Sequence, residues 1–261
     1  MDTNSQIRAA AAAVIGSRHL KAARNGQDAA AVWIGDGAGA VVVCDGCGSS
    51  GSSEVGARIG ARLVIAALSR RLSAGGSASD AALWAGVRDE VVFQINELVN
   101  TMLGTAVAQE CFARETVLRE YFLFTIVAGA VAGNEAAVWA LGDGGFAING
   151  RARELGPFED NQPPYLAYDL LGMPQTAVLE VVPAIAAGTI VVATDGIAEV
   201  GLDAIAVERC LAHPDALRRR LAVLARAEEK IEWDARRVVR APAALQDDGA
   251  VAILAWRGSP S

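Results

Sequence analysis

The chain has 261 residues, of which 20% are charged, and its formal net charge is −7. An acidic chain repels polyanions, which argues against nucleic acid or an anionic membrane surface as its main partner. No stretch approaches the roughly 18 apolar residues of a membrane span, and Met1 to Ser5 lack the basic segment of a secretory signal, so a cytoplasmic protein is expected.

Four cysteines, Cys44, Cys47, Cys111 and Cys210, do not make a disulfide framework. Cys44 and Cys47 form a C-x-x-C pair, but the sequence has no second pair for zinc and no thioredoxin-like pattern around them. We therefore expect Cys44 in the core and Cys47 in a loop.

The N-terminal part of the chain predicts a hairpin. Residues 30–34 and 40–44 are short apolar runs joined by Asp36-Gly37, a dipeptide that favours a two-residue hairpin turn. Before the hairpin, residues 7–15 are expected as a strand or a short helix, and residues 21–28 as a polar loop.

Two long helices are predicted next. Residues 54–72 have apolar side chains at helical spacing, and a second helix begins near residue 80 with Ser79 as its N-cap. The expected buried stripes are Val55, Ile59, Leu63 and Ala66 on the first helix, and Trp84, Val87, Val91, Ile95, Leu98 and Met102 on the second.

From residue 121 the apolar spacing becomes strand-like. We expect a meander with hairpin turns at Gly133-Asn134 and Asp143-Gly144. Residues 156–176 are rich in proline and are expected to form an irregular surface excursion. The expected strands are 121–131, 136–141, 145–148, 178–182, 189–194 and 250–256, and the expected helices are 197–211 and 215–233.

The order of these elements predicts the fold class. Strands and helices come in separate blocks, which favours an α+β fold with antiparallel sheets and helices on their outer faces. Because no repeat or linker is visible, one domain covering residues 1–261 is expected.

Two aspartates stand out among the Asp-Gly pairs of the chain. Asp36 and Asp143 fit tight turns, which is the common role of this dipeptide. Asp45 and Asp195 instead follow buried apolar runs and precede helical patterns, so each would present a carboxylate at the end of a strand.

Two further acids, Asp28 and Asp247, lie in loops that flank predicted strands. If the fold brings them together with Asp45 and Asp195, the four carboxylates repel one another unless cations neutralise them. A cation site is therefore expected where these strands end.

The donor types indicate the metal. The only histidines, His19 and His213, are not near these motifs in the sequence, so an all-oxygen donor set is expected. Such a set suits Mg²⁺ or Mn²⁺ better than zinc. Gly46, which has no side chain, would let its backbone carbonyl approach an ion.

Five motifs together resemble the metal-dependent protein serine/threonine phosphatases of the PP2C (PPM) type, in a bacterial-like form. They occur in the order of that family and cover nearly the whole chain. The matching segments are Arg24-Asn25-Gly26-Gln27-Asp28, Val43-Cys44-Asp45-Gly46-Cys47-Gly48, Trp139-Ala140-Leu141-Gly142-Asp143, Ala193-Thr194-Asp195-Gly196 and Asp247-Asp248-Gly249-Ala250-Val251.

The resemblance implies a four-layer α-β-β-α sandwich and a site with two Mg²⁺ or Mn²⁺ ions and an optional third. It implies that Asp45 bridges the two ions, that the Gly46 carbonyl binds one of them, and that Asp195 and Asp247 hold an ion. Asp28 would hold waters at the site. Asp247 is preferred to Asp248 because the metal aspartate of the family lies four residues before the strand valine, here Val251.

The implied activity is hydrolysis of phosphoserine and phosphothreonine in proteins, by attack of a water that bridges the metals. Asp45 and Asp195 would be the central catalytic residues. The implied partners are phosphorylated proteins and an opposing serine/threonine kinase, with no nucleic acid or membrane, and a monomer is expected.

Several positions depart from the family pattern. Ala23 stands where the family often has a phosphate-binding arginine, so Arg24, one residue later, is the candidate for that role. Gln27 replaces a common glutamate, and Cys47 replaces a histidine proposed as general acid in many eukaryotic members. Gly145 replaces the arginine of G-D-S-R, which makes Asp143 a structural residue by expectation.

These departures leave a second interpretation open. The chain could be a catalytically weak regulatory module that keeps the metal-binding fold and binds a partner protein. Nucleotide binding by the loop from Gly46 to Gly56 is disfavoured, because the sequence has no phosphate-binding G-x-x-x-x-G-K-[ST] motif.

Overall fold

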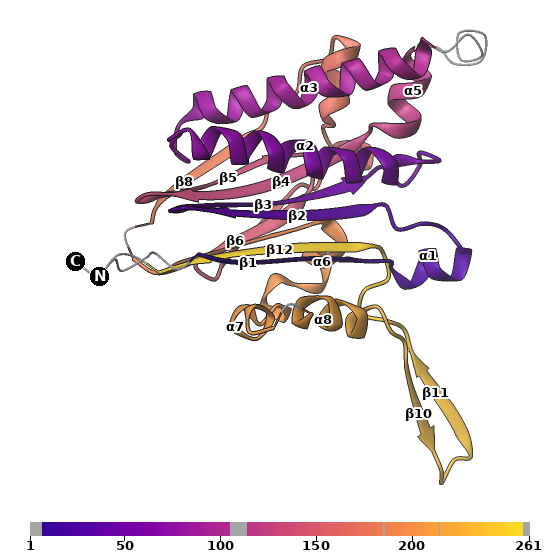
Figure 1. Ribbon diagram of the computed structural model, residues 1–261. Helices are drawn as coiled ribbons and strands as arrows, with labels where there is room; N and C mark the ends of the chain where they lie inside the picture. Colours follow the sequence, from indigo (N-terminus) through magenta and orange to yellow (C-terminus); the bar gives the residue numbers. More distant parts are fainter. Residues whose placement is uncertain (1–6, 105–113, 185, 214, 258–261) are drawn as a thin grey trace.

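The computed structural model describes residues 7–104, 114–184, 186–213 and 215–257. Two five-stranded antiparallel sheets pack face to face, with helices on both outer faces (Figure 1). This four-layer α-β-β-α sandwich confirms the predicted fold class. Met1 to Ser5 and Cys111, on which two expectations rest, lie outside the described residues.

The first sheet has the strand order β2-β3-β4-β5-β8, and its outer face is covered by α2 and α3 (Figure 1). Its elements are β2 (Asp28–Gly35), β3 (Ala38–Gly46), β4 (Phe124–Ala132), β5 (Glu135–Leu141), β8 (Val178–Pro183), α2 (Ser53–Ser73), α3 (Ala81–Leu103) and α5 (Arg114–Tyr121).

The second sheet has the order β1-β12-β9-β6-β7, with α6, α7 and α8 outside it (Figure 1). Its elements are β1 (Arg8–Val14), α1 (Ser17–Ala22), β6 (Gly144–Ile148), β7 (Arg151–Leu155), β9 (Gly188–Ala193), α6 (Asp195–Val200), α7 (Val207–Leu211), α8 (Ala216–Leu224) and β12 (Gly249–Trp256).

The apolar run of β3 is continuous because this strand is covered on both faces. Val41 and Val43 point into the core between the two sheets, whereas Val42 and Cys44 point toward the helices. Alternate side chains of a strand face opposite sides, so a strand inside a sandwich needs apolar residues at every position. Cys44 is fully buried, as predicted.

The N-terminal half follows the predicted pattern with two differences. The hairpin turns at Asp36-Gly37, and residues 7–15 contain a strand, but α1 occupies part of the expected polar loop. Asp80, not Ser79, caps α3, because the Asp80 carboxylate accepts a hydrogen bond from the Ala82 N–H at 2.8 Å.

The predicted buried face of α2 was only partly right. Ile59 and Leu63 pack against the core as partly buried side chains. Val55 is exposed, and the helix instead buries small residues such as Gly56 and Gly60. A β-carbon on Gly60 would lie 2.3 Å from the Phe124 ring, so this face lets the helix approach the sheet closely.

The predicted meander was wrong at Asp143-Gly144. β4 and β5 do form a hairpin, but β6 pairs with β9 in the other sheet. The chain therefore changes sheets at this dipeptide, where Gly142 and Gly144 have φ of 109° and 107°.

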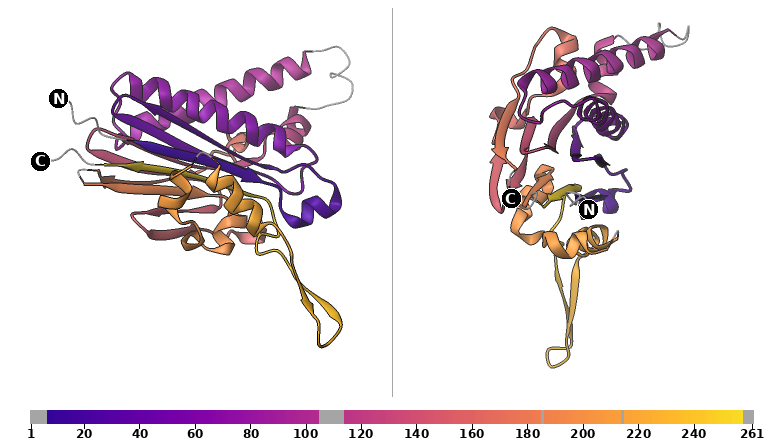
Figure 2. Two further views of the ribbon diagram at one scale, coloured as in Figure 1. Left: turned by 60° about the horizontal axis from the view of Figure 1, so that its bottom comes forward. Right: turned by 60° about the vertical axis from the view of Figure 1, so that its left-hand side comes forward.

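The predicted helix over residues 215–233 was also wrong in its second half. After α8 ends at Leu224, β10 (Glu228–Glu232) and β11 (Arg237–Ala241) form a hairpin that projects from the body of the molecule (Figures 1 and 2). The predicted helix over 197–211 is divided into α6, the short 3₁₀ helix Leu202–Ala204, and α7.

Residues 156–176 contain two short 3₁₀ helices, Glu159–Asn161 and Leu166–Leu171. Leu166 and Ala167 are buried, and Asp169 forms an ion pair with Arg88 of α3 at 2.7 Å.

None of the helices in the described ranges combines the length and apolar character needed to cross a membrane.

Candidate metal centre

Asp28 and Asp45 lie side by side at one end of the first sheet. Asp28 begins β2 and is the direct cross-strand partner of Asp45, near the end of β3. Asp45 is in turn the partner of Thr125 on β4. Cross-strand partners present their side chains on the same face, with β-carbons about 4.5–5.5 Å apart. The antiparallel register therefore brings the first two predicted acids together.

The remaining acids come from the second sheet. Asp195 follows β9, Asp247 precedes β12, and these two strands are paired. A β-carbon on Gly196 would lie 2.2 Å from the Asp248 carbonyl oxygen and 3.5 Å from the Asp247 β-carbon. The turn after Asp195 therefore packs directly against the Asp247-Asp248 segment.

Thr194 connects the two groups of acids. Its hydroxyl donates to the Asp28 carboxylate at 2.6 Å and accepts a hydrogen bond from the Ala250 N–H at 2.9 Å. Thr194 is buried, as is Asp28. One side chain thus joins the start of β2 to the end of β9 and the start of β12.

The carboxylates perturb one another strongly. Burial, followed by repulsion from Asp28 and Asp195, raises the pKa of Asp45 well above its ordinary value. Burial raises the pKa of Asp28 to about 8, opposed by the hydrogen bond from Thr194. A divalent cation at this position would remove the repulsion, so the residues present fit a metal.

Asp143 also faces this cluster. Burial and the charge of Asp195 raise the pKa of Asp143 to about 6. Among the described residues its buried Oδ1 atom has no hydrogen-bond partner. A buried carboxylate oxygen without a partner in the protein is a place where an ordered water or an ion can bind. The structural role expected for Asp143 stays a prediction.

Asp247 and Asp248 occupy different environments. Asp248 is buried, and its carboxylate accepts hydrogen bonds from the backbone N–H groups of Gly16 and Gln27, at 2.7 and 2.6 Å. Asp247 is exposed, and within the described part of the chain its carboxylate accepts a bond only from the Asp248 N–H, through Oδ1 at 2.9 Å. Asp247 is therefore the more accessible of the two carboxylates, and its choice as the metal ligand stays a prediction.

His19 lies at the site, contrary to the expectation from the sequence. Its Nδ1 atom is 2.8 Å from Asp248 Oδ2, and possible ligand atoms of His19, Asp247 and Asp248 lie within 4.8 Å of one another. The expectation failed because α1 was not predicted; this helix of six residues carries too little periodic pattern to be found from spacing.

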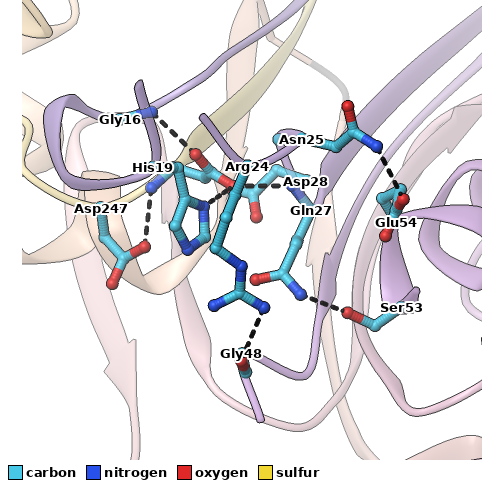
Figure 3. Close-up of polar contacts among 12 residues, drawn as sticks. Gly16, His19, Arg24, Asn25, Gln27, Asp28, Gly48, Ser53, Glu54 and Asp247 are labelled. Atoms are coloured by element: carbon cyan, nitrogen blue, oxygen red, sulfur yellow. Dashed lines mark hydrogen bonds and ion pairs between the residues drawn. The ribbon is translucent and has the colours of Figure 1, made fainter. Parts of the chain in front are cut away.

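Arg24 is exposed, and its guanidinium donates a long hydrogen bond of 3.4 Å to the Gly48 carbonyl (Figure 3). With Gln27 and Glu54 it lines a small polar pocket of about 210 Å³. A phosphate-binding role for Arg24 is compatible with its place beside this loop but requires the guanidinium to leave Gly48.

Gln27 and Gly46 shape the loop after β3. The Gln27 amide donates to the Ser53 hydroxyl at 2.7 Å and to the Cys47 carbonyl at 3.2 Å. A β-carbon on Gly46 would lie 2.8 Å from Ser53 Oγ, so the absence of a side chain is required here. Gln27 therefore holds the loop against the start of α2 where the family commonly has glutamate.

Cys47 is half-buried, and its sulfur is 3.1 Å from the Ser49 hydroxyl. Burial raises the pKa of the thiol, but hydrogen bonds from Ser49 and Tyr165 outweigh it and leave the pKa below its ordinary value. The residue lies in the loop after β3, as predicted.

Comparison with known proteins gives a consistent result. The family model for protein phosphatase 2C matches residues 15–239. No curated protein matches the sequence.

Several solved structures share the fold. The Mycobacterium tuberculosis serine/threonine phosphatase PstP/Ppp has a TM-score of 0.54 and 18% identity, over 97% of this chain and 99% of that chain. PppA, a regulatory component of the T6SS in Pseudomonas aeruginosa, has a TM-score of 0.55 and 17% identity, over 97% and 99%. A PstP catalytic domain in complex with two manganese ions has a TM-score of 0.54 and 17% identity, over 98% and 100%.

At these identities the structural similarity establishes the shared fold. The family model spans most of the chain and includes the segments of Asp28, Asp45 and Asp195, but it ends before Asp247. The chain therefore belongs to the protein phosphatase 2C family.

Proposed function

We propose that this protein is a metal-dependent phosphatase that hydrolyses phosphoserine and phosphothreonine in other proteins. The observation that carries the proposal is the convergence of Asp28, Asp45 and Asp195, whose carboxylates come from both sheets. Burial, followed by repulsion from Asp28 and Asp195, raises the pKa of Asp45. Such a cluster is stable as a set of anions only when cations share it.

Asp45, Asp195 and Asp247 would hold two divalent ions, with the Gly46 carbonyl as a further oxygen donor. Asp28, hydrogen-bonded to Thr194, would orient waters at the site. The oxygen-rich donor set suits Mn²⁺ or Mg²⁺, and a related PstP structure contains two manganese ions. When bound, these ions would activate water and neutralise charge on the phosphoryl oxygens.

The chain's own residues would position the substrate. The pocket beside Arg24 is polar and is also lined by Gln27, the residue before Asp28. The Arg24 guanidinium would bind a phosphate oxygen after leaving the Gly48 carbonyl. The phosphorylated protein would thus be held at the loop between Cys47 and Ser53.

An assay with metal-loaded protein tests the proposal. We expect Mn²⁺-dependent turnover of phosphopeptides and p-nitrophenyl phosphate. Asp195→Asn should reduce turnover by more than about 100-fold, because even residues that only orient metal ligands cost about 10–100-fold. Asp36→Asn, which changes an exposed Asp-Gly turn at the other end of the hairpin, is the matched control and should keep full activity.

If the loaded protein leaves both substrates untouched, the proposed activity is wrong. The alternative, a regulatory module of the same fold, is favoured by Ala23 at the position of the family arginine. Calorimetry that detects Mn²⁺ binding without turnover would support this alternative.

A further inference from the structure

The orientation of the His19 ring is fixed by Asp248. Both oxygens of the Asp248 carboxylate accept a hydrogen bond from the backbone. The Gly16 N–H donates to Oδ1, and the Gln27 N–H donates to Oδ2. The carboxylate therefore acts as an acceptor toward His19 Nδ1 at 2.8 Å, which places the ring proton on Nδ1. The lone pair then lies on Nε2. A carboxylate behind a histidine, fixing its tautomer, is the arrangement that orients metal-binding imidazoles.

The free Nε2 atom faces Asp247. Figure 3 shows the second ring nitrogen of His19 on the side of the Asp247 carboxylate. One possible ligand atom from each of His19, Asp247 and Asp248, with either ring nitrogen counted for the histidine, lies within 4.8 Å of the other two. The His19 side chain is only 14% exposed. Asp248 accepts three hydrogen bonds, and among the described residues no hydrogen bond is made by His19 Nε2 or Asp247 Oδ2.

The pair is adjacent to the acidic cluster described above. The Asp247 β-carbon would be 3.5 Å from a β-carbon on Gly196, next to Asp195. The Asp247 side chain that His19 faces therefore packs against the turn after Asp195.

We propose that His19 is a metal ligand, which binds through Nε2 the same divalent ion as Asp247. This inference rests on the proposed metal centre and adds one nitrogen to its oxygen donors. Imidazole ligands favour first-row transition metals, whereas Mg²⁺ prefers oxygen. The site should therefore select Mn²⁺ over Mg²⁺ more strongly than an all-oxygen site would.

A structural role is the competing explanation, since the Asp248 contact also holds α1 against the β12 loop. His19→Asn separates the two roles. The asparagine amide can donate to Asp248 from about the position of Nδ1, but it has no atom in place of Nε2. His213→Asn is the matched control, because His213 is exposed and is the only other histidine of the chain.

Pulsed electron paramagnetic resonance on Mn²⁺-loaded protein with ¹⁵N-labelled histidine gives a direct test. We expect a histidine nitrogen coupling to Mn²⁺ in the natural protein and in His213→Asn, and its loss in His19→Asn. Calorimetry should show Mn²⁺ affinity reduced about 10-fold or more in His19→Asn, with a smaller change for Mg²⁺.

The outcomes are distinguishable. If the natural protein binds Mn²⁺ without any histidine coupling, or if the coupling persists in His19→Asn, His19 is not a ligand, and the proposed phosphatase is unaffected. If the natural protein binds no Mn²⁺ at all, both this inference and the proposed function are wrong.

Discussion

At the scale of single residues, the Thr194 hydroxyl group joins the two sheets beneath the acidic cluster. It donates to the Asp28 carboxylate and accepts from the Ala250 N–H, and all three groups are buried. The hydrogen bond from Thr194 also lowers the pKa of Asp28 against the larger effect of burial. The threonine before Asp195 is therefore part of the site's support, which the Thr-Asp-Gly motif alone did not indicate.

Thr194→Val tests this support. The change keeps the shape of the side chain but leaves the Ala250 N–H without its acceptor and Asp28 without its donor. A buried group left unpaired costs about 1–3 kcal/mol, so we expect the free energy of unfolding to fall by this amount in chemical denaturation. Thr194→Ser keeps the hydroxyl and should lie much closer to the natural protein. Equal stability of the two variants would contradict the assigned role.

At the scale of elements, the sequence predicted those parts whose local pattern and tertiary environment agree. The hairpin around Asp36-Gly37 and both long helices were predicted because turn chemistry and apolar spacing suffice for them. β3 was predicted because both of its faces are buried, which makes the run of Val41 to Cys44 continuous. The positions of Asp28 and Asp45 then follow from the hairpin register.

The errors occurred where tertiary contacts decide the structure. Asp143-Gly144 is a dipeptide typical of a hairpin turn, but here the chain passes from one sheet to the other at this point. Only the pairing of β6 with β9 distinguishes this crossing from a hairpin. The hairpin β10–β11 has largely exposed side chains, so its sequence lacks the alternation of a half-buried strand. His19 was missed because its contact with Asp248 spans almost the whole chain. The roles of Asp28, Asp45, Gly46, Asp195, Asp247 and Arg24 as ligands stay predictions.

The buried face of α2 gives a prediction at this scale. A β-carbon on Gly56 would lie 2.0 Å from the Tyr121 carbonyl oxygen and 2.9 Å from the Phe122 α-carbon, both backbone atoms. Alanine favours a helix over glycine by about 1 kcal/mol, but overpacking against backbone typically costs about 1–3 kcal/mol. We expect Gly56→Ala to destabilise the protein in urea denaturation. Val55→Ala, on the exposed face, should change stability by less than about 0.5 kcal/mol, and a stabilised Gly56→Ala would contradict the observed packing.

At the scale of the whole molecule, folding brings together acids that are distant in the sequence. Asp28 and Asp45 belong to one sheet, and Asp195 and Asp247 follow or precede strands of the other. Their repulsion is therefore absent from the unfolded chain and present in the metal-free folded protein. Metal binding and stability should be linked, because an ion that binds only the folded state stabilises it by mass action.

This linkage predicts an unusual dependence of stability on pH in the absence of metal. The pKa of Asp28 rises from 3.8 to about 8 on folding, so between these values the folded protein binds more protons than the unfolded chain. The contribution of Asp28 to stability is thus present below its unfolded pKa and is lost as the pH rises toward 8.

With EDTA, we expect the Tm measured by circular dichroism to fall between about pH 5 and about pH 8. Excess Mn²⁺ should reduce this fall, and Asp28→Asn should reduce it without metal, whereas Asp36→Asn should not. A Tm that stays level or rises with pH in EDTA would show that the carboxylates are not clustered as described, since repulsion among buried acids must grow as they lose their protons.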